Sequence, residues 1–93
     1  MAIATINPTT GKTVRTFEPF SPARVSECLD RANAAYREHR RTTFSERAKR
    51  MEKAASILDD ESRDLGRLMT VEMGKPIGAG IAEAQKCATA CRY

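Results

Sequence analysis

The sequence predicts a mainly α-helical chain with a short N-terminal β-hairpin and four amphipathic helices. Two short runs rich in Ile, Val, Thr and Phe precede all of the helical patterns. Four later segments place apolar residues three or four positions apart, which gives each helix one apolar face. Leu, Ile, Val and Phe make up only about a sixth of the 93 residues. We therefore expect these faces to need a further partner surface, as in a piece of a larger protein.

Residues 1–18 are expected to form the hairpin, with strands over residues 2–6 and 13–17. The intervening residues, Asn7-Pro8-Thr9-Thr10-Gly11-Lys12, have the composition of a turn. Asn7 can cap the turn with its side chain, Pro8 fixes one φ angle, and Gly11 tolerates a positive φ, so the turn needs no ligand. A phosphate-binding loop at Gly11-Lys12 is disfavoured, because Ile6 stands where that motif needs its first glycine.

Residues 21–93 are expected to be helical, and the first helix begins with Ser21 as N-cap and Pro22 in its first turn. No Cys, Asp or second His joins His39 at metal-ligand spacing, so we interpret it as a partly buried packing residue. The apolar face of this helix consists of Val25, Leu29, Ala32, Tyr36 and His39.

Ser45 or Thr43 can cap a second helix. The four residues Asp59-Asp60-Glu61-Ser62 interrupt its pattern and would place acidic side chains at the positive end of a third helix. The apolar face of the second helix consists of Phe44, Ala48, Met51, Ala55 and Leu58, and that of the third of Leu65, Leu68, Met69 and Met73.

The five residues Glu72-Met73-Gly74-Lys75-Pro76 separate the third helix from the fourth. Gly74 can take the left-handed conformation that ends a helix, and Pro76 suits the first turn of the next one. We expect Gly74 to send the fourth helix back across the third, with Glu72 and Lys75 pairing locally or with parts of the protein outside this sequence.

Small residues dominate the fourth helix and predict close packing against another element. Its pattern is still running at Arg92-Tyr93, where no stop signal appears, so we expect a chain truncated in mid-helix. The apolar face consists of Ile77, Ile81, Ala84, Cys87 or Ala88, and Cys91, and the small residues are Gly78, Ala79, Gly80, Ala82, Ala88 and Ala90.

A net charge of +4 permits an acidic partner or nucleic acid. The basic side chains between residues 37 and 53 would form that patch, but acidic residues are interspersed and no aromatic residues alternate with them as in single-strand binders. We therefore favour a solvated helix surface and expect no nucleic acid. The basic residues are Arg37, Arg40, Arg41, Arg47, Lys49, Arg50 and Lys53, with His39 as a possible eighth.

Three cysteines without a C-x-x-C pair argue against a disulfide framework and a structural zinc site. Cys28, Cys87 and Cys91 lie on or beside apolar helix faces, so we expect them to be buried and unreactive. No apolar run approaches the roughly 18 residues of a membrane span. A reducing cytoplasmic location without membrane attachment is the expectation.

Several short stretches, in this order and spacing, resemble the N-terminal portion of the NAD(P)-dependent aldehyde dehydrogenases. The turn at residues 7–12 is similar to that family's N-P-A-T-G-E, Arg47-Ala48 to the R-A that opens its second helix, and residues 72–76 to its E-M-G-K-P. Glu83 stands where an acidic residue usually follows, and Arg92-Tyr93 is similar to the start of R-Y-Y-A. Within the family, these stretches are most similar to those of bacterial succinate-semialdehyde dehydrogenases. His39 departs from it, because many members have tryptophan there.

The resemblance implies that residues 1–93 are an incomplete N-terminal part of a larger α/β dehydrogenase that oxidises an aldehyde, succinate semialdehyde in particular, to a carboxylic acid. It implies NADP or NAD as cofactor of the whole protein, with none bound to this chain, and the rest of the dehydrogenase chain and a homo-oligomer as partners. The family's nucleophilic cysteine, glutamate base and cofactor-binding strands have no counterpart here. We therefore assign no catalytic, cofactor-binding or metal-binding residue. The alternative is a small stand-alone basic helical module that binds nucleic acid or an acidic partner.

Overall fold

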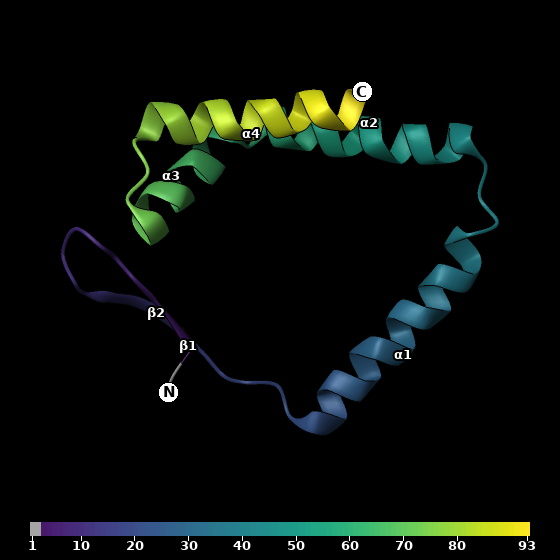
Figure 1. Cartoon of the computed structure of the whole chain (residues 1–93), viewed down its shortest axis with the longest axis horizontal. Helices are drawn as coiled ribbons and strands as arrows, with labels where there is room; N and C mark the ends of the chain where they lie inside the picture. The colour runs from purple at the N-terminus through teal and green to yellow at the C-terminus, as the bar shows by residue number, and fades with distance from the viewer. Residues whose placement is uncertain (1–2) are drawn as a thin grey trace.

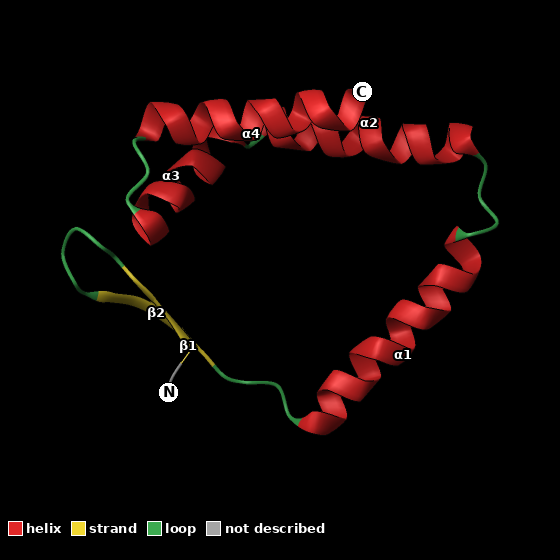
Figure 2. Ribbon diagram, viewed as in Figure 1, coloured by secondary structure: helices red, strands yellow, loops and turns green. Residues whose placement is uncertain are grey.

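The computed structural model describes residues 3–93 and confirms the predicted fold class (Figure 2). Ala2, which was expected in the first strand, lies outside the described residues. The elements follow the chain in the order β1 (Ile3–Ile6), β2 (Thr13–Phe17), α1 (Pro22–His39), α2 (Phe44–Asp60), α3 (Ser62–Met73) and α4 (Ile77–Arg92).

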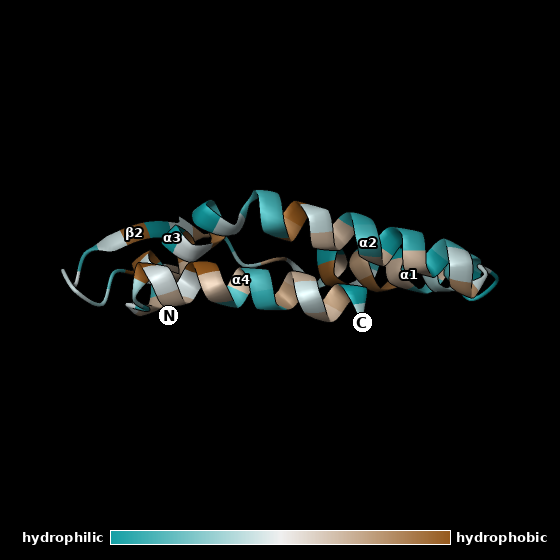
Figure 3. Ribbon diagram, turned by 90° about the horizontal axis from the view of Figure 1, so that it is seen from above, coloured by the Kyte–Doolittle hydropathy of each residue, from teal (hydrophilic) through white to brown (hydrophobic). Residues whose placement is uncertain are grey.

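These elements form one open layer. Its extents are 48 × 37 × 14 Å, and the thin dimension is evident when the molecule is seen from above (Figure 3). The radius of gyration is 17.3 Å, whereas a compact domain of this length has about 12 Å. Figure 1 shows α2 and α4 side by side, with α3 beneath one end of α4 and α1 standing apart. A stable domain buries the apolar faces of its elements between at least two packed layers. This single layer leaves such faces in contact with solvent.

The hairpin forms as the turn residues predict. β1 and β2 pair antiparallel with Ile3 opposite Phe17, and the register shifts between Thr5 and Ile6. The Asn7 side chain accepts a hydrogen bond from the backbone N–H of Thr9 at 2.9 Å. Gly11 has a φ of +68°, the left-handed conformation that its position in the turn requires.

A small core lies between α2 and α4. Its buried hydrophobic residues are Ala55 of α2 with Ala84 and Ala88 of α4. Of the two alternatives at the fourth helix, Ala88 therefore faces the core, while Cys87 is exposed. Alanines allow the two helices to approach closely, but they bury little apolar area for each residue.

Two glycines bring α3 and α4 into backbone contact. A Cβ on Gly80 would lie 2.9 Å from the Cα and carbonyl oxygen of Gly66, and a Cβ on Gly66 would lie 2.8 Å from the backbone nitrogen of Ile81. Gly78 has open space around it, so of the neighbouring glycines in α4 it is Gly80 that makes the predicted close approach.

Three helix ends differ from the expectation. Asp59 and Asp60 belong to the last turn of α2, with Glu61 as the residue between it and α3. Their charges therefore oppose the helix dipole instead of favouring it, because anions are unfavourable at a C-terminus. Pro76 precedes the first residue of α4 instead of lying within its first turn, a shift of one position.

The cap of α2 is Thr43. Its hydroxyl accepts from the Glu46 backbone N–H at 3.2 Å, and the Glu46 carboxylate accepts from the Thr43 backbone N–H at 2.7 Å. This reciprocal arrangement is a capping box, and it decides between the two caps that the sequence allowed.

Several apolar residues of the predicted helix faces are not packed against any other element in the structure. Phe44 of α2 is 87% exposed, and Leu29 of α1 is 65% exposed. Among residues 3–93, α1 packs against no other helix or strand, and only its last residue, His39, is bonded to α2. The first half of α2 and all of α1 thus present apolar side chains to solvent.

Candidate functional site

The junction between α3 and α4 is held by several polar contacts. Gly74 ends α3 with a φ of +74°, as predicted, and its N–H donates to the Thr70 carbonyl at 2.9 Å. The Thr70 hydroxyl lies 2.7 Å from the Lys75 carbonyl and 3.1 Å from the Gly66 carbonyl. Because a hydroxyl has one proton, it donates to one carbonyl at a time. The Lys75 carbonyl is the nearer acceptor, and this hydrogen bond ties the loop back onto α3.

Glu72 and Lys75 do not pair with each other. The Thr5 hydroxyl of β1 donates to the Glu72 carboxylate at 2.8 Å, and the Lys75 ammonium lies 3.5 Å from the Glu83 carboxylate of α4. One charge therefore holds the hairpin against α3, and the other links the loop to α4.

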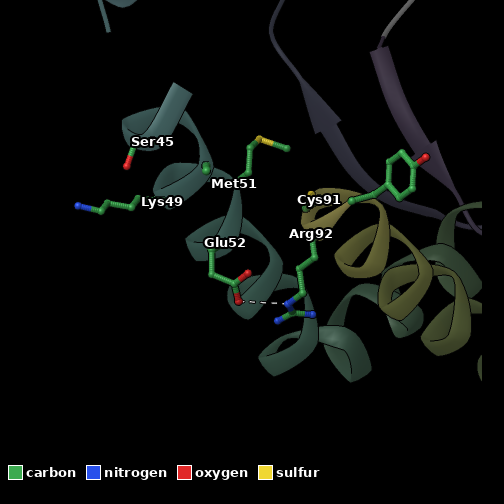
Figure 4. Close-up of a pocket in the computed structure, with 8 residues that line it drawn as sticks. Ser45, Lys49, Met51, Glu52, Cys91 and Arg92 are labelled. Carbon is green, nitrogen blue, oxygen red and sulfur yellow. Dashed lines mark hydrogen bonds and ion pairs between the residues drawn. The ribbon is translucent and has the colours of Figure 1, made fainter. Parts of the chain in front are cut away.

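A shallow hollow lies where the end of α4 meets the first half of α2 (Figure 4). The Arg92 guanidinium points toward Glu52, which it contacts at 3.1 Å, and it contacts Asp59 at 2.8 Å. Hydrogen bonds to Asp59 and then Glu52 raise the pKa of Arg92 above its ordinary value. Asp59, unfavourably placed at a helix C-terminus, thus obtains a cation from the neighbouring helix. The hollow is lined by Ser45, Ala48, Lys49, Met51, Glu52, Cys91, Arg92 and Tyr93.

The three thiols are free, and the structure corrects their predicted burial. Cys87 is exposed, while Cys28 and Cys91 are partly buried. Cys87 turns away because Ala88 takes the position that faces α2. Within residues 3–93, no group of three or more His, Cys, Asp or Glu side chains is arranged to hold a metal ion.

Two of the basic residues at the corner between α1 and α2 are bonded to the protein itself. Arg47 donates to the Thr42 hydroxyl at 3.1 Å and to the His39 and Arg40 carbonyls at 3.3 and 3.4 Å. Arg50 lies 2.8 Å from Nδ1 of His39. His39 is exposed and contacts Arg50, so its interpretation as a partly buried packing residue was wrong.

Sequence reasoning missed several of these side chains. Thr70 gave no signal because a threonine inside a helix usually means only a lower helix propensity. Arg92 was noted for its likeness to R-Y-Y-A, and its two carboxylate partners lie in another helix. The contacts of Glu72, Lys75 and Arg92 join the hairpin to α3, the loop to α4, and α4 to α2. No helix of residues 3–93 combines the length and apolar character required to cross a membrane.

The structure is thus a helical segment with a hairpin held against α3. Its sequence matches the model of the aldehyde dehydrogenase family over residues 1–93. The chain belongs to the aldehyde dehydrogenase family.

Curated relatives share close to half of the sequence. An aldehyde dehydrogenase of Paenarthrobacter nicotinovorans is 47% identical over 93 residues. A probable NADP(+) succinate-semialdehyde dehydrogenase of Synechocystis is 46% identical, and an NADP(+) succinate-semialdehyde dehydrogenase of Mycobacterium leprae is 45% identical. Each alignment covers 100% of this chain and 20% of the relative. The chain thus spans about a fifth of the length of these relatives.

Proposed function

We propose that residues 1–93 are the N-terminal part of an NAD(P)-dependent aldehyde dehydrogenase that converts succinate semialdehyde to succinate in the cytoplasm. The observation that carries this proposal is the family match over the whole chain. The substrate and a preference for NADP follow the names of the Synechocystis and Mycobacterium relatives, at 46% and 45% identity. A homo-oligomer of the whole protein belongs to the same proposal.

The proposed role of this chain within the whole protein is structural. The contacts that support it are those of the α3–α4 junction and of Arg92, because they join helix to helix and hairpin to helix. The oxidation itself transfers a hydride from the aldehyde carbon to the nicotinamide, and water supplies the second oxygen of the acid. We assign the groups that carry out these steps to the part of the whole protein outside these residues, and none to Cys28, Cys87 or Cys91.

The test compares the whole protein with the 93-residue chain. Each is supplied with succinate semialdehyde and either NADP or NAD, and formation of the reduced cofactor is followed by absorbance. We expect turnover by the whole protein and none by the isolated chain. Turnover by the isolated chain that is lost on Cys87→Ser or Cys91→Ser would overturn the structural role. A whole protein that oxidises other aldehydes alone would overturn the proposed substrate.

A salt titration separates this role from that of a basic module. Phosphate contacts make nucleic-acid binding fall steeply with ionic strength. Because Arg47 and Arg50 are bonded within the corner between α1 and α2, we expect only weak attachment of the isolated chain to duplex DNA at low salt. Tight binding that is lost as salt rises would favour the basic module instead.

A further inference from the structure

Helix α1 presents an apolar face to solvent and packs on nothing else in residues 3–93. Val25, Leu29 and Tyr36 are 45%, 65% and 60% exposed. They are four and seven positions apart and so share one face of the helix. The opposite face is charged, as Glu27, Arg31 and Glu38 show. An amphipathic helix of this kind is stabilised mainly by packing of its apolar face, which here has no partner.

The angle at which α1 leaves α2 is nonetheless fixed locally. Arg47, near the start of α2, reaches back to the carbonyls that end α1, and the Thr42 hydroxyl donates to the His39 carbonyl at 2.7 Å. Arg50 of α2 contacts His39 of α1. These bonds join consecutive segments and do not depend on packing between the two helices. They hold α1 apart from α3 and α4, as Figure 1 shows.

The amount of exposed surface indicates how large the missing partner is. The chain exposes 7788 Å², whereas a compact protein of 10.3 kDa exposes about 5,400 Å². The excess of about 2,400 Å² is roughly three times what one partner buries in a standard protein–protein interface. A second copy that formed one interface of standard size would cover only about a third of it. The alignments leave four-fifths of each relative outside the match, which is a body of sufficient size.

We propose that α1 is a docking arm whose angle is preset by Arg47, and that its Val25, Leu29 and Tyr36 face packs against the part of the whole protein outside these 93 residues. This inference rests on the proposed function, since that function supplies the occupant. It adds to that function the face of α1 that makes the contact, and it assigns Arg47 as the positioning residue for that face.

Cysteine protection in the whole protein tests the docked face. Leu29→Cys places a thiol on that face, and Ala34→Cys places one on the opposite face as the matched control. Both are made with Cys28→Ser, and the labelled fraction at each site is read by peptide mass spectrometry and normalised to the rate in denaturant. We expect labelling at residue 29 to be slower than at residue 34 by about tenfold or more, because buried thiols are inert. Equal rates at the two sites would overturn the docking.

A second pair of variants tests the preset angle. In the Leu29→Cys protein, Arg47→Met removes the bonds to the end of α1, and Lys49→Met removes a charge from the same helix as the control. Arg47→Met should raise labelling at residue 29 several-fold while Lys49→Met leaves it unchanged. An equal effect of both would remove Arg47 from the proposal. Dehydrogenase activity with equal labelling at residues 29 and 34 would leave the proposed function in place and overturn only the docked face.

Discussion

The sharpest test of the junction compares Gly74→Val with Lys75→Met. Gly74 has a φ of +74°, where a residue with a side chain is strained by about 1–3 kcal/mol. A Cβ there would also lie 3.3 Å from Cγ of Pro8, so the hairpin turn would have to shift. Lys75, by contrast, makes one ion pair with Glu83 at 3.5 Å, and a pair of this partly exposed kind contributes about 0–1 kcal/mol. Gly74→Val should therefore be the more harmful change by about 1 kcal/mol or more.

The assay is the urea midpoint of the whole protein, followed by far-UV circular dichroism. Gly11→Val is the matched control, because Gly11 has a φ of +68° but no atom within 4 Å of an added Cβ. Its cost measures conformational strain alone, and the additional cost at Gly74 measures the Pro8 contact. Equal destabilisation by Gly74→Val and Lys75→Met would refute this account of the junction.

Four further outcomes follow from the packing, the caps and the exposed surface. Gly80→Ala should destabilise the whole protein by about 1–3 kcal/mol because of its contact with Gly66 at 2.9 Å, while Gly78→Ala, in open space, should stabilise by up to about 1 kcal/mol; urea midpoints that move together would contradict this. Thr43→Ala should cost about 1 kcal/mol. The Thr43 backbone N–H, and then its hydroxyl, lower the pKa of Glu46 below its ordinary value of 4.5, so the stabilising contribution of this carboxylate is present above that value and is lost as the pH falls through the lowered pKa. Helicity measured from pH 6 downward should show that loss in the parent more than in Glu46→Gln. The isolated chain should aggregate or unfold without cooperativity, and a sharp melt of a monodisperse monomer in calorimetry would contradict it.

Local chemistry explains why most of the fold was predictable. A turn such as residues 7–12, a capping threonine and a glycine that ends a helix act through bonds within a few positions, so their residue types are sufficient signals. The positive φ of Gly74 followed in this way from the helical patterns on either side of it. The prediction that Asp59 and Asp60 lie at the start of the third helix was wrong, because acidic residues also occur at helix C-termini when another helix supplies a cation. Arg92 is that cation, and it lies 33 positions from Asp59 in the chain.

Contacts between distant segments could not be predicted in the same way. Thr5 and Glu72 are 67 positions apart, and neither residue type specifies the other. The apolar face of α1 shows a different limit. Its spacing predicts a helix that must be covered, but spacing carries no information on whether the cover lies within the same 93 residues. The three-dimensional arrangement was needed to show that it does not lie in the part described, residues 3–93.

The hairpin turn and the Gly74 junction, which the sequence presents as two separate stretches, are one structural unit. Pro8 of the turn lies where an added Cβ at Gly74 would contact it, and Thr5 of the adjoining strand donates to Glu72. A side chain at residue 74 would therefore be opposed twice, by its own backbone angle and by the turn. The same geometry explains why the Glu72 carboxylate matters to the hairpin, whereas the Lys75 ammonium is paired with Glu83 of α4. A change in either stretch should consequently be compensated by changes in the other, whereas Lys75 and Glu83 can vary as a separate pair.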